Sequence, residues 1–297
     1  MAMQLKKLIK IHGIAFSVLA YVVSFISLFL SAHNENFSLV ILALFIVMLG
    51  VPHGSLDTLF AKELFHLGQL RKWPKFILNY LMIASVVLVF WLLLPTLCLL
   101  IFLLISIIHF SDDLIAGTPT FSRILYGGII IFLPALLHTN DLTRLYGYLI
   151  NIEHAKSIVT VCHFIALPWL AGLVVVIYQL YRFNIVSSLE VSAVVMLAIF
   201  VTPLLAFTIY FCLMHSFRHL IRSISYLKHT SKKTMLASLI IPTTIVFIVG
   251  FIVWKNIMPS SIDASLIKII FVTLAALTVP HMILLEKSGF SNWIKKI

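Results

Sequence analysis

The chain has 297 residues, of which 62% are hydrophobic and 10% are charged, and its formal net charge at pH 7 is +11. Because a soluble domain carries about 25% charged residues, this composition excludes an ordinary soluble protein. The positive charge does not indicate nucleic-acid binding, since the Lys and Arg residues lie in short loops and at the termini, as at the cytoplasmic edges of membrane proteins, and form no basic stripe with interleaved aromatic residues.

The N-terminal segment is basic and is followed by a long apolar stretch. Lys6, Lys7 and Lys10 precede residues 12–31. A signal peptide has the same order of features, but this stretch is longer than the usual apolar region of a signal peptide, and no clear small-residue cleavage site follows it. We therefore expect a retained first helix whose N-terminus faces the cytoplasm.

Apolar runs near or beyond the roughly 18 residues needed to cross a bilayer recur along the whole chain. They cover residues 12–31, 37–60, 76–94, 97–111, 122–138, 158–181, 190–214, 235–254 and 264–285. Polar segments such as 33–36, 72–75 and 228–233 separate them. Only helices or closed barrels satisfy the backbone in lipid, and the alternating pattern of barrel strands is absent. The sequence therefore predicts an all-α integral membrane protein with a single transmembrane domain over residues 1–297.

The basic residues predict which side of the membrane each loop occupies. With the N-terminus inside, two crossings bring the chain back inside at the basic segment 62–75 and place His53 near the inner edge. Two more crossings bring His109 to the same edge. The first two candidate histidines are thus expected on the cytoplasmic side.

The segment 122–138 is predicted not to be a full crossing. If it and 158–181 both crossed, the basic segment 218–233 would face outward, against the positive-inside rule. The segment 122–138 is shorter and contains two glycines and a proline, so we expect a re-entrant or interfacial piece. The result is a multispanning helical bundle of about eight transmembrane helices, or seven or nine, in the cell inner (plasma) membrane. The basic residues 287–296 then join the N-terminus on the cytoplasmic side.

Four histidines lie in polar clusters at the ends of apolar runs, namely His53, His109, His215 and His219. An imidazole at membrane depth is costly, so it usually faces the bundle interior, pairs or binds a metal. His215 and His219 are four residues apart, which places both rings on one helical face and suits two ligands on one metal. The other two histidines could complete the shell of a metal centre that acts on a hydrophobic substrate. Ligation by imidazole alone leaves Fe, Zn, Cu and Ni open.

Three aspartates closely follow two of these histidines. Asp57 lies four residues after His53, and Asp112 and Asp113 lie three and four residues after His109. A metal-bound histidine commonly donates its other N–H to a carboxylate, which fixes the tautomer. All three aspartates are therefore candidates for orienting a ligand. The alternative is that they are helix caps or solvated loop charges.

His281 is the one further histidine with a candidate role. It follows a proline near the inner end of the last span, where it is either an extra ligand, a substrate contact or a histidine satisfied by packing. Arg218, beside the histidine pair, is interpreted as an interfacial charge. The remaining histidines are expected to be structural, namely His12, His33, His66, His138, His154, His163 and His229.

Cysteines and aromatic residues carry weaker signals. Cys98, Cys162 and Cys212 fall within apolar runs without C-x-x-C spacing, so we expect small buried hydrophobic residues and neither disulfides nor a structural zinc site. An aromatic stripe before the histidine pair is expected to face lipid or fill the bundle, although an apolar tunnel beside a metal would suit a long polyene. The stripe comprises Phe200, Phe207, Tyr210 and Phe211.

At these residues the chain resembles the Brp/Blh family of β-carotene 15,15′-dioxygenases, the integral-membrane enzymes that make retinal in microbes carrying rhodopsins. The matching elements are Pro-His53-Gly-x-x-Asp57, His109-Phe with a following Asp, His215-Ser-x-Arg-His219 and Pro-His281. Each element is weak alone, but their order and spacing match from the second span to the last. One departure is Ser111 after His109-Phe, where the family usually has Gly.

The resemblance implies a non-haem Fe(II) centre held by four histidines, which correspond to His53, His109, His215 and His219. It also implies that O₂ cleaves the central 15,15′ double bond of β-carotene, or of a related apolar polyene, to give two retinal molecules. The histidines would leave one or two positions of the iron open to O₂, with the polyene in an apolar tunnel beside it. The protein would contribute positioning and tuning of the iron by carboxylates. Lateral access from the membrane lipids would suit such a substrate.

Two alternatives remain open at this point. A membrane di-iron desaturase or hydroxylase of lipid substrates would have both H-x-x-x-H and H-x-x-H-H boxes, whereas this chain has one H-x-x-x-H and no H-x-x-H-H. A metal or proton transporter would have ionisable residues near the bilayer midplane and repeat symmetry. Here the polar residues cluster at one predicted membrane edge, and no repeat is visible.

Overall fold

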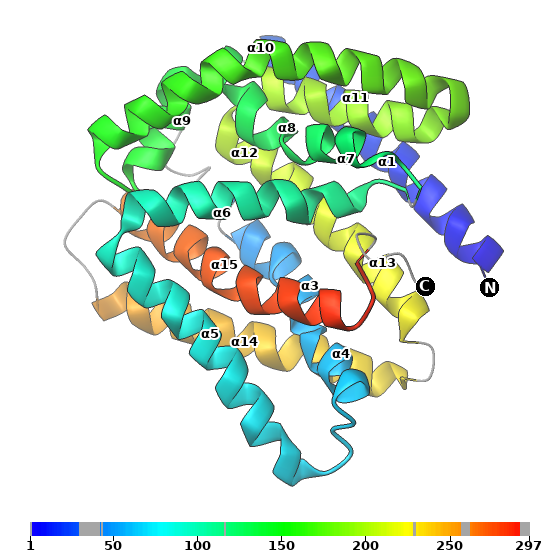
Figure 1. The fold of residues 1–297 in the computed structure, drawn as a ribbon, viewed down its shortest axis with the longest axis vertical. Coiled ribbons are helices and arrows are strands. Elements are labelled where there is room, and N and C mark those ends of the chain that lie inside the picture. Colours follow the sequence, from blue (N-terminus) through cyan, green and yellow to red (C-terminus); the bar gives the residue numbers. More distant parts are fainter. Residues whose placement is uncertain are drawn as a thin grey trace.

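Figure 1 shows the computed structural model of this chain, which is a bundle of helices. The structure describes residues 2–29, 42, 44–115, 117–227, 230–256 and 262–291. Within these residues every regular element is helical and none is a strand, which confirms the expected all-α fold. The polar segment 33–36, residues 228–229 and the basic residues 295–296 lie outside the described residues.

The elements fall into long helices and short connecting helices. The long ones are α1 (Ala2–Phe29), α5 (Trp73–Leu93), α6 (Pro95–Phe110), α10 (Ile152–Phe183), α11 (Ile185–Phe200), α14 (Lys232–Asn256) and α15 (Ile262–Lys287). The short α-helices are α3 (Pro52–Ser55), α4 (Asp57–Leu64), α7 (Thr120–Gly127), α8 (Ile129–Phe132), α9 (Thr139–Gly147), α12 (Pro203–Ile209) and α13 (Phe217–Tyr226). The 3₁₀ turns are η2 (Leu70–Lys72), η3 (Ser111–Asp113) and η4 (Leu133–Leu136), and the π-helices are η1 (Ile46–Gly50) and η5 (Tyr210–Ser216).

Seven helices of the described chain are long and apolar enough to cross a membrane, and the number rises to eight if one bent pair counts as a span. They cover Met3–Phe29, Trp73–Leu93, Pro95–Asp113, Ile152–Phe183, Pro203–Tyr226, Lys232–Asn256 and Ala264–Lys287. This confirms the predicted multispanning bundle of about eight helices.

The segment expected to be re-entrant is sharply bent. Thr120–Leu136 and Thr139–Gly147 meet at 109°, as in a broken span or a re-entrant loop. Gly127 lets α7 approach the end of α6 closely, since a Cβ at this position would overlap the carbonyl oxygen of Ile107. The bent segment therefore packs directly against the turn of α6 that carries His109.

The predicted span 190–214 is wrong in its bounds. α11 ends early, and a short extended piece leads to Pro203, where α12 begins. Proline has no backbone N–H and disfavours the helical conformation of the residue before it, so the apolar run is divided at this point. The next candidate span is Pro203–Tyr226, which places His215 and His219 inside a helical segment and not beyond its end.

The elements that carry the candidate residues lie in the middle of the bundle. In Figure 1, α10 and α11 run along one side and α5 and α14 along the other, with α6, α15 and the α12–α13 segment between them. α1 packs on α11, α15 packs on α5, and η1 packs on η5. The two outer groups of helices therefore enclose the segments on which the histidines lie.

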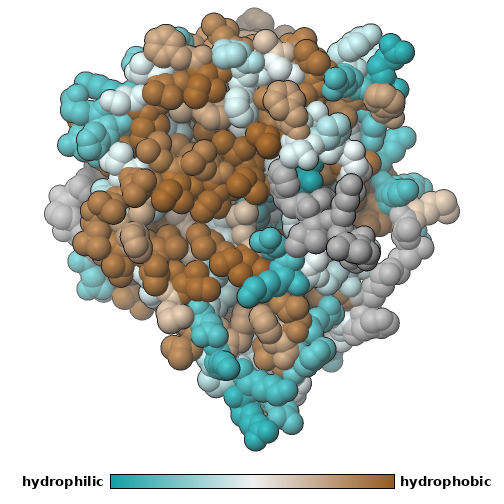
Figure 2. Space-filling view, viewed as in Figure 1, coloured by the Kyte–Doolittle hydropathy of each residue, from teal (hydrophilic) through white to brown (hydrophobic). Residues whose placement is uncertain are grey.

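The outer helices present apolar side chains to their surroundings. α14 has no buried residue, and α5 buries only Ala84 and Trp91. Figure 2 shows hydrophobic residues over much of the visible face and hydrophilic residues at the narrow end, where Figure 1 places the α4–α5 connection. An apolar surface of this extent is typical of contact with lipid.

Candidate metal centre

Five histidine side chains meet in the interior of the bundle. His53 lies in α3, His109 in α6, His215 in η5, His219 in α13 and His281 in α15. All five are buried, with exposed fractions between 2% and 9%. The centroids of neighbouring rings lie between 4.5 and 6.3 Å apart. We call these five residues the histidine cluster, and they include every histidine that the sequence pattern identifies as a candidate.

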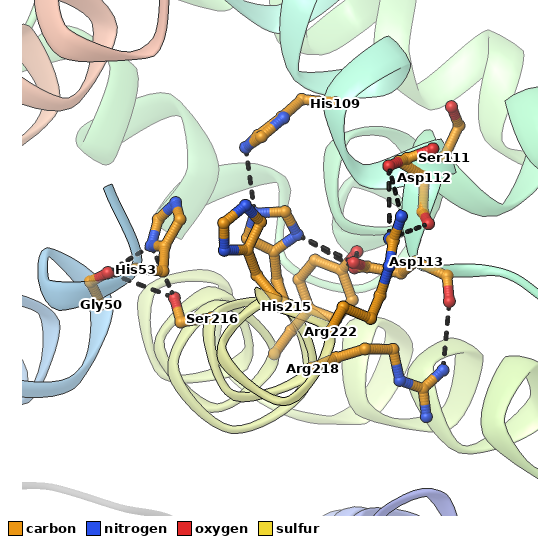
Figure 3. Close-up of polar contacts among 12 residues, drawn as sticks. Gly50, His53, His109, Ser111, Asp112, Asp113, His215, Ser216, Arg218 and Arg222 are labelled. Carbon is orange, nitrogen blue, oxygen red and sulfur yellow. Dashed lines mark hydrogen bonds and ion pairs between the residues drawn. The ribbon is translucent and has the colours of Figure 1, made fainter. Parts of the chain in front are cut away.

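Two π-helices position two members of the cluster. η1 immediately precedes the α3 segment with His53, and η5 contains His215. π-Helices are rare and occur often at functional sites. Gly50 permits the close packing of η1 on η5, since a Cβ there would overlap the ring of Phe211. The carbonyl oxygen of Gly50 accepts hydrogen bonds from Nδ1 of His53 and, at 3.3 Å, from Oγ of Ser216 (Figure 3).

His215 is held between a carboxylate and a second histidine. Its Nδ1 donates to the carboxylate oxygens of Asp113 at 3.0 and 3.1 Å, and its Nε2 lies 3.0 Å from Nε2 of His109 (Figure 3). Oη of Tyr210 donates to Oδ2 of Asp113 at 2.8 Å. The guanidinium of Arg218 donates to the backbone carbonyl oxygen of Asp113 at 3.1 Å. Asp113 thus orients the ring of His215 and is itself held in place from two sides.

His281 also has a carboxylate partner. Its Nδ1 donates to Oδ1 of Asp57 at 2.7 Å. The other oxygen of this carboxylate, Oδ2, accepts a hydrogen bond from Oη of Tyr80 at 2.8 Å. The three side chains come from α15, α4 and α5, and Asp57 is buried.

Serine hydroxyls lie beside two further members of the cluster. Oγ of Ser216 is 3.1 Å from Nδ1 of His53, and Oγ of Ser223 is 3.3 Å from Nδ1 of His219. Both serines are buried. A hydroxyl can donate to Nδ1 or accept from it, whereas the carbonyl oxygen of Gly50 only accepts and so keeps the proton of His53 on Nδ1, which leaves the lone pair of its Nε2 available to a ligand.

The remaining ring nitrogens fit a transition-metal ion. Nε2 of His219 and Nε2 of His281 are buried without a hydrogen-bond partner in the described part of the chain. His53, His109 and His281 can each place one ring nitrogen within 4.8 Å of the others. Leaving a buried polar atom unpaired costs about 1–3 kcal/mol, so these nitrogens point to a ligand. Two nitrogens bound to one ion at about 2.1 Å and at a right angle lie about 3.0 Å apart, which matches His109 and His215.

Asp112 has different partners from the other two candidate aspartates. Its carboxylate forms ion pairs with Arg123 at 2.8 Å and with Arg222 at 3.2 Å. Arg222 also donates to the carbonyl oxygen of Phe290 at 3.1 Å. These contacts tie η3 to α7, to α13 and to the chain after α15. Through these two arginines, Asp112 therefore connects the elements that surround the cluster.

The interpretation of Arg218 as an interfacial charge is wrong. Its side chain is buried and forms an ion pair with Glu190, with nitrogen–oxygen distances of 2.6 and 3.0 Å. The pair ties α13 to α11. Glu190 was not identified as a site residue from the sequence, although an acidic residue inside an apolar run is a signal that could have found it.

The two aspartates that hold histidines are not paired with their neighbours in sequence. Asp57 binds His281 and Asp113 binds His215, and each of these contacts joins segments far apart in the chain. Tyr80 and Tyr210, which hold the two carboxylates, were not identified as site residues from the sequence. Nothing in the spacing of aromatic residues within an apolar run distinguishes these two.

Aromatic rings form a row that ends at the cluster. Phe207 stacks on Phe211 with centroids 5.3 Å apart, and Phe211 stacks on His215 at 5.8 Å. Phe271 packs against Phe207 at 5.2 Å. The aromatic stripe thus fills the bundle at these positions and gives the cluster one apolar side.

A pocket of about 180 Å³ lies on another side of the cluster. His109, His215 and His219 line it, and its further walls include charged residues such as Arg222 and Glu286. Apolar residues such as Ile108, Met282 and Leu285 line it as well. Its volume is below the roughly 300–1,000 Å³ of ligand pockets, so it is too small to hold a long polyene.

The other expectations for histidines and cysteines concern structural roles. His163 bonds to the carbonyl oxygen of Ala135 at 2.7 Å, and His12 bonds to that of Leu213 at 2.8 Å. His33 and His229 lie outside the described residues. All three cysteines are free, and two are buried, namely Cys162 and Cys212.

Comparison with known proteins gives one family. A family model described as beta-carotene 15,15′-dioxygenase matches residues 44–287, a range that contains the whole histidine cluster. The chain is also similar to the beta-carotene 15,15′-dioxygenase of the uncultured marine bacterium 66A03, with 32% identity over 251 residues that make up 81% of this chain and 90% of the relative. No solved structure matches the chain.

Proposed function

Because this chain belongs to the β-carotene 15,15′-dioxygenase family, we propose that it is a membrane-embedded dioxygenase that cleaves the central double bond of β-carotene with O₂ to give two retinal molecules. The observation that carries the proposal is the buried histidine cluster inside the segment that matches the family. Both comparisons favour this reaction over the two alternatives, a lipid desaturase or hydroxylase and a transporter.

The proposed metal is Fe(II), held by His53, His109, His215 and His219. Bound ferrous iron would supply the redox chemistry that O₂ needs. The imidazole-only donor set and the 3.0 Å separation of the Nε2 atoms of His109 and His215 support a transition-metal ion, and membership of a dioxygenase family favours iron among the candidates. Imidazole donors alone also suit zinc, copper and nickel, so the metal identity is a point for experiment.

The residues around the ligands hold the imidazoles in place for this chemistry. Asp113 keeps the proton of His215 on Nδ1, so that Nε2 is free to bind. Arg218 and Tyr210 hold Asp113 through its backbone carbonyl and its carboxylate. Asp57 and Asp113 are buried and hydrogen-bonded, so the protein itself satisfies the carboxylates nearest the cluster.

The proposed substrate is β-carotene or a related apolar polyene taken laterally from the bilayer. The aromatic row that ends at His215 supports an apolar approach to the metal, since the stacked rings of Phe207 and Phe211 form an apolar wall beside the cluster. The pocket of about 180 Å³ beside Arg222 is too small to hold the whole of a long polyene. Apolar surface on α5 and α14 supports contact with the lipids that carry such a substrate.

The proposed location is the cell inner membrane, with the N-terminus and the metal site toward the cytoplasm. The basic residues Lys6, Lys7 and Lys10 and the basic segment 62–75 support this orientation.

Expression in a host that makes β-carotene tests the reaction. We expect the orange colour to fade and retinal to accumulate, and we expect His215→Ala and His219→Ala to abolish both changes. His154→Ala is the matched control, because His154 is exposed and bonds to Thr96 away from the cluster. Unchanged β-carotene in the presence of folded, iron-loaded protein would contradict the proposal.

Metal analysis of the purified protein tests the cofactor separately. One iron per chain is expected for the proposed centre, and two per chain would favour the di-iron alternative. Zinc in place of iron, in a preparation that makes retinal, would overturn the iron assignment while leaving the reaction intact.

A further inference from the structure

We propose that His281 is a fifth ligand of the metal, and that Asp57 and Tyr80 hold it in the way that Asp113 and Tyr210 hold His215. This inference rests on the proposed metal centre and extends its ligand set. It comes from two sets of hydrogen bonds, each of which joins a tyrosine, an aspartate and a histidine in the same order on different elements of the fold.

The first set lies between η3 and η5. Oη of Tyr210 donates to Oδ2 of Asp113 at 2.8 Å, and Oδ1 of the same carboxylate accepts a hydrogen bond from Nδ1 of His215 at 3.0 Å. All three side chains are buried. The carboxylate thus joins one phenol to one imidazole.

The second set joins α4, α5 and α15. Oη of Tyr80 donates to Oδ2 of Asp57 at 2.8 Å, and Oδ1 of that carboxylate accepts a hydrogen bond from Nδ1 of His281 at 2.7 Å. Asp57 and His281 are buried, and the hydroxyl of Tyr80 is partly buried. The order of groups, phenol to carboxylate to Nδ1, is the same as in the first set, although the residues come from unrelated segments.

A buried carboxylate needs strong donors to offset its desolvation. In each set the two donors are a phenol and an imidazole N–H, which keeps the proton of the imidazole on Nδ1. The lone pair of Nε2 is then left to bind a metal, as in carboxylate–histidine–metal arrangements. A structural role for His281 would explain the contact with Asp57 but would leave Nε2 unexplained.

Nε2 of His281 is the atom that decides between these roles. It is buried and has no hydrogen-bond partner among the described residues. The ring of His281 lies 5.3 Å, between centroids, from each of His53, His109 and His219. His281 is also one of the three residues, with His53 and His109, that can bring ring nitrogens within 4.8 Å of one another. The surroundings of this nitrogen are therefore the other proposed ligands.

Metal binding by the purified full chain tests the proposal without any use of the carotenoid. Apoprotein in detergent is titrated with Co(II), whose visible spectrum responds to the number and type of its ligands, and with Fe(II) under nitrogen. We expect His281→Ala to weaken binding of both ions by more than about 100-fold and to change the Co(II) spectrum. We expect Asp57→Asn to weaken binding by about 10–100-fold, as for other carboxylates behind a ligand, and Tyr80→Phe to have a smaller effect in the same direction.

Two controls separate loss of a ligand from loss of structure. His281→Gly is titrated with and without added imidazole, and recovery of the wild-type Co(II) spectrum with imidazole is expected only if His281 is a ligand. His163→Gln is the matched control, since His163 lies in α10 and bonds to the carbonyl oxygen of Ala135, and it should bind metal as the wild type does. A further measurement needs no variant: the X-ray absorption spectrum of the Fe(II)-loaded wild type should fit five imidazole ligands on the iron.

A wild-type affinity and spectrum in folded His281→Ala would overturn the proposal, as would an absorption fit to four imidazoles. Loss of retinal formation in that variant with unchanged metal binding would make His281 a substrate contact instead. The two proposals fail in different ways. If five histidines bind the metal but β-carotene is not cleaved, only the proposed function is wrong. If β-carotene is cleaved and only four histidines bind the metal, only the proposal of a fifth ligand is wrong.

Discussion

Each carboxylate that holds a histidine of the cluster is itself held, and this makes single side chains important for metal affinity. Asp113 accepts hydrogen bonds from His215 and Tyr210, and its carbonyl oxygen accepts one from Arg218. An aspartate with three donors has little freedom to move. Removal of the negative charge of Asp113 should therefore weaken metal binding by the imidazole of His215.

Asp113→Asn should weaken Fe(II) binding by about 10–100-fold, because the amide is a poorer acceptor for the N–H of His215 and carries no charge to support it. Anaerobic titration of the apoprotein with Fe(II) measures the change. Asp141→Asn is the control, since Asp141 is partly exposed and lies 3.5 Å from His138 and 3.9 Å from Arg144, away from the cluster. Wild-type affinity in Asp113→Asn would show that the carboxylate does not act through His215.

Gly50→Ala should destabilise the protein by about 1–3 kcal/mol, because the added methyl group would overlap the ring of Phe211 and overpack the contact between the two π-helices. Since Phe211 stacks on His215, Fe(II) affinity should fall as well. Gly54→Ala is the matched control in the next turn, because a Cβ there meets no atom within 4 Å. Thermal unfolding in detergent compares the two variants, and equal midpoints would count against the packing argument.

At the scale of single residues, the sequence predicted which types of side chain gather but not how they pair. The histidines and aspartates were found because ionisable groups beside apolar runs stand out. Their pairing was not readable because Asp57 begins a new helix after His53 and Asp113 ends a 3₁₀ turn after His109. Each break rotates the side chain away from its neighbour in sequence and toward a distant segment.

At the scale of elements, the ion pair between Arg218 and Glu190 joins α13 to α11 beside the cluster. Both side chains are buried. Breaking a buried pair leaves one charge without a partner, whereas removing both charges does not. This asymmetry gives a test of what holds the two helices together.

Glu190→Gln and Arg218→Met should each destabilise the protein by about 3–5 kcal/mol, and the double variant should lose less than the sum of the two. Unfolding midpoints in one detergent give the comparison. Glu153→Gln is the control, because Glu153 is exposed in α10 and lies 3.7 Å from Lys156. Additive losses in the double variant would mean that the pair contributes nothing as a pair.

Some element boundaries could be predicted from the sequence and others could not. The glycines and the proline of 122–138, with the positive-inside rule, predicted a re-entrant or interfacial piece, and the break of 109° that follows Leu136 fits a re-entrant loop or a broken span. The break at Pro203 was overlooked although its cause is local, because an unbroken apolar run was given more weight than one proline. The π-helices η1 and η5 have no sequence signature, since they arise from one extra residue that the packing accommodates.

At the scale of the whole molecule, composition alone was enough for the fold class. A chain with 62% hydrophobic residues and repeated long apolar runs has few options besides a helical bundle in lipid, and seven or eight long apolar helices confirm that prediction. The side on which the site faces stays a prediction, because it depends on charges in loops.

Labelling of single cysteines tests the orientation after the three native cysteines are replaced. Lys72→Cys lies in the basic connection and should react with a membrane-impermeant maleimide only from the cytoplasmic side. Asn256→Cys is the partner variant. Asn256 is exposed at the C-terminal end of α14, which is predicted to face outward, so this cysteine should react from outside intact cells. The reverse pattern of labelling would invert the proposed topology.

The helix α14 has no buried residue, and yet it contacts α3, which carries His53. The hydroxyl of Thr243 in α14 lies 2.8 Å from that of Ser55, two residues beyond His53. A helix that meets mostly acyl chains adjusts its tilt to the thickness of the bilayer. A change of bilayer thickness should therefore shift the position of His53, one of the proposed metal ligands, so vesicles of short-chain and long-chain lipids should give the same protein different affinities for Fe(II).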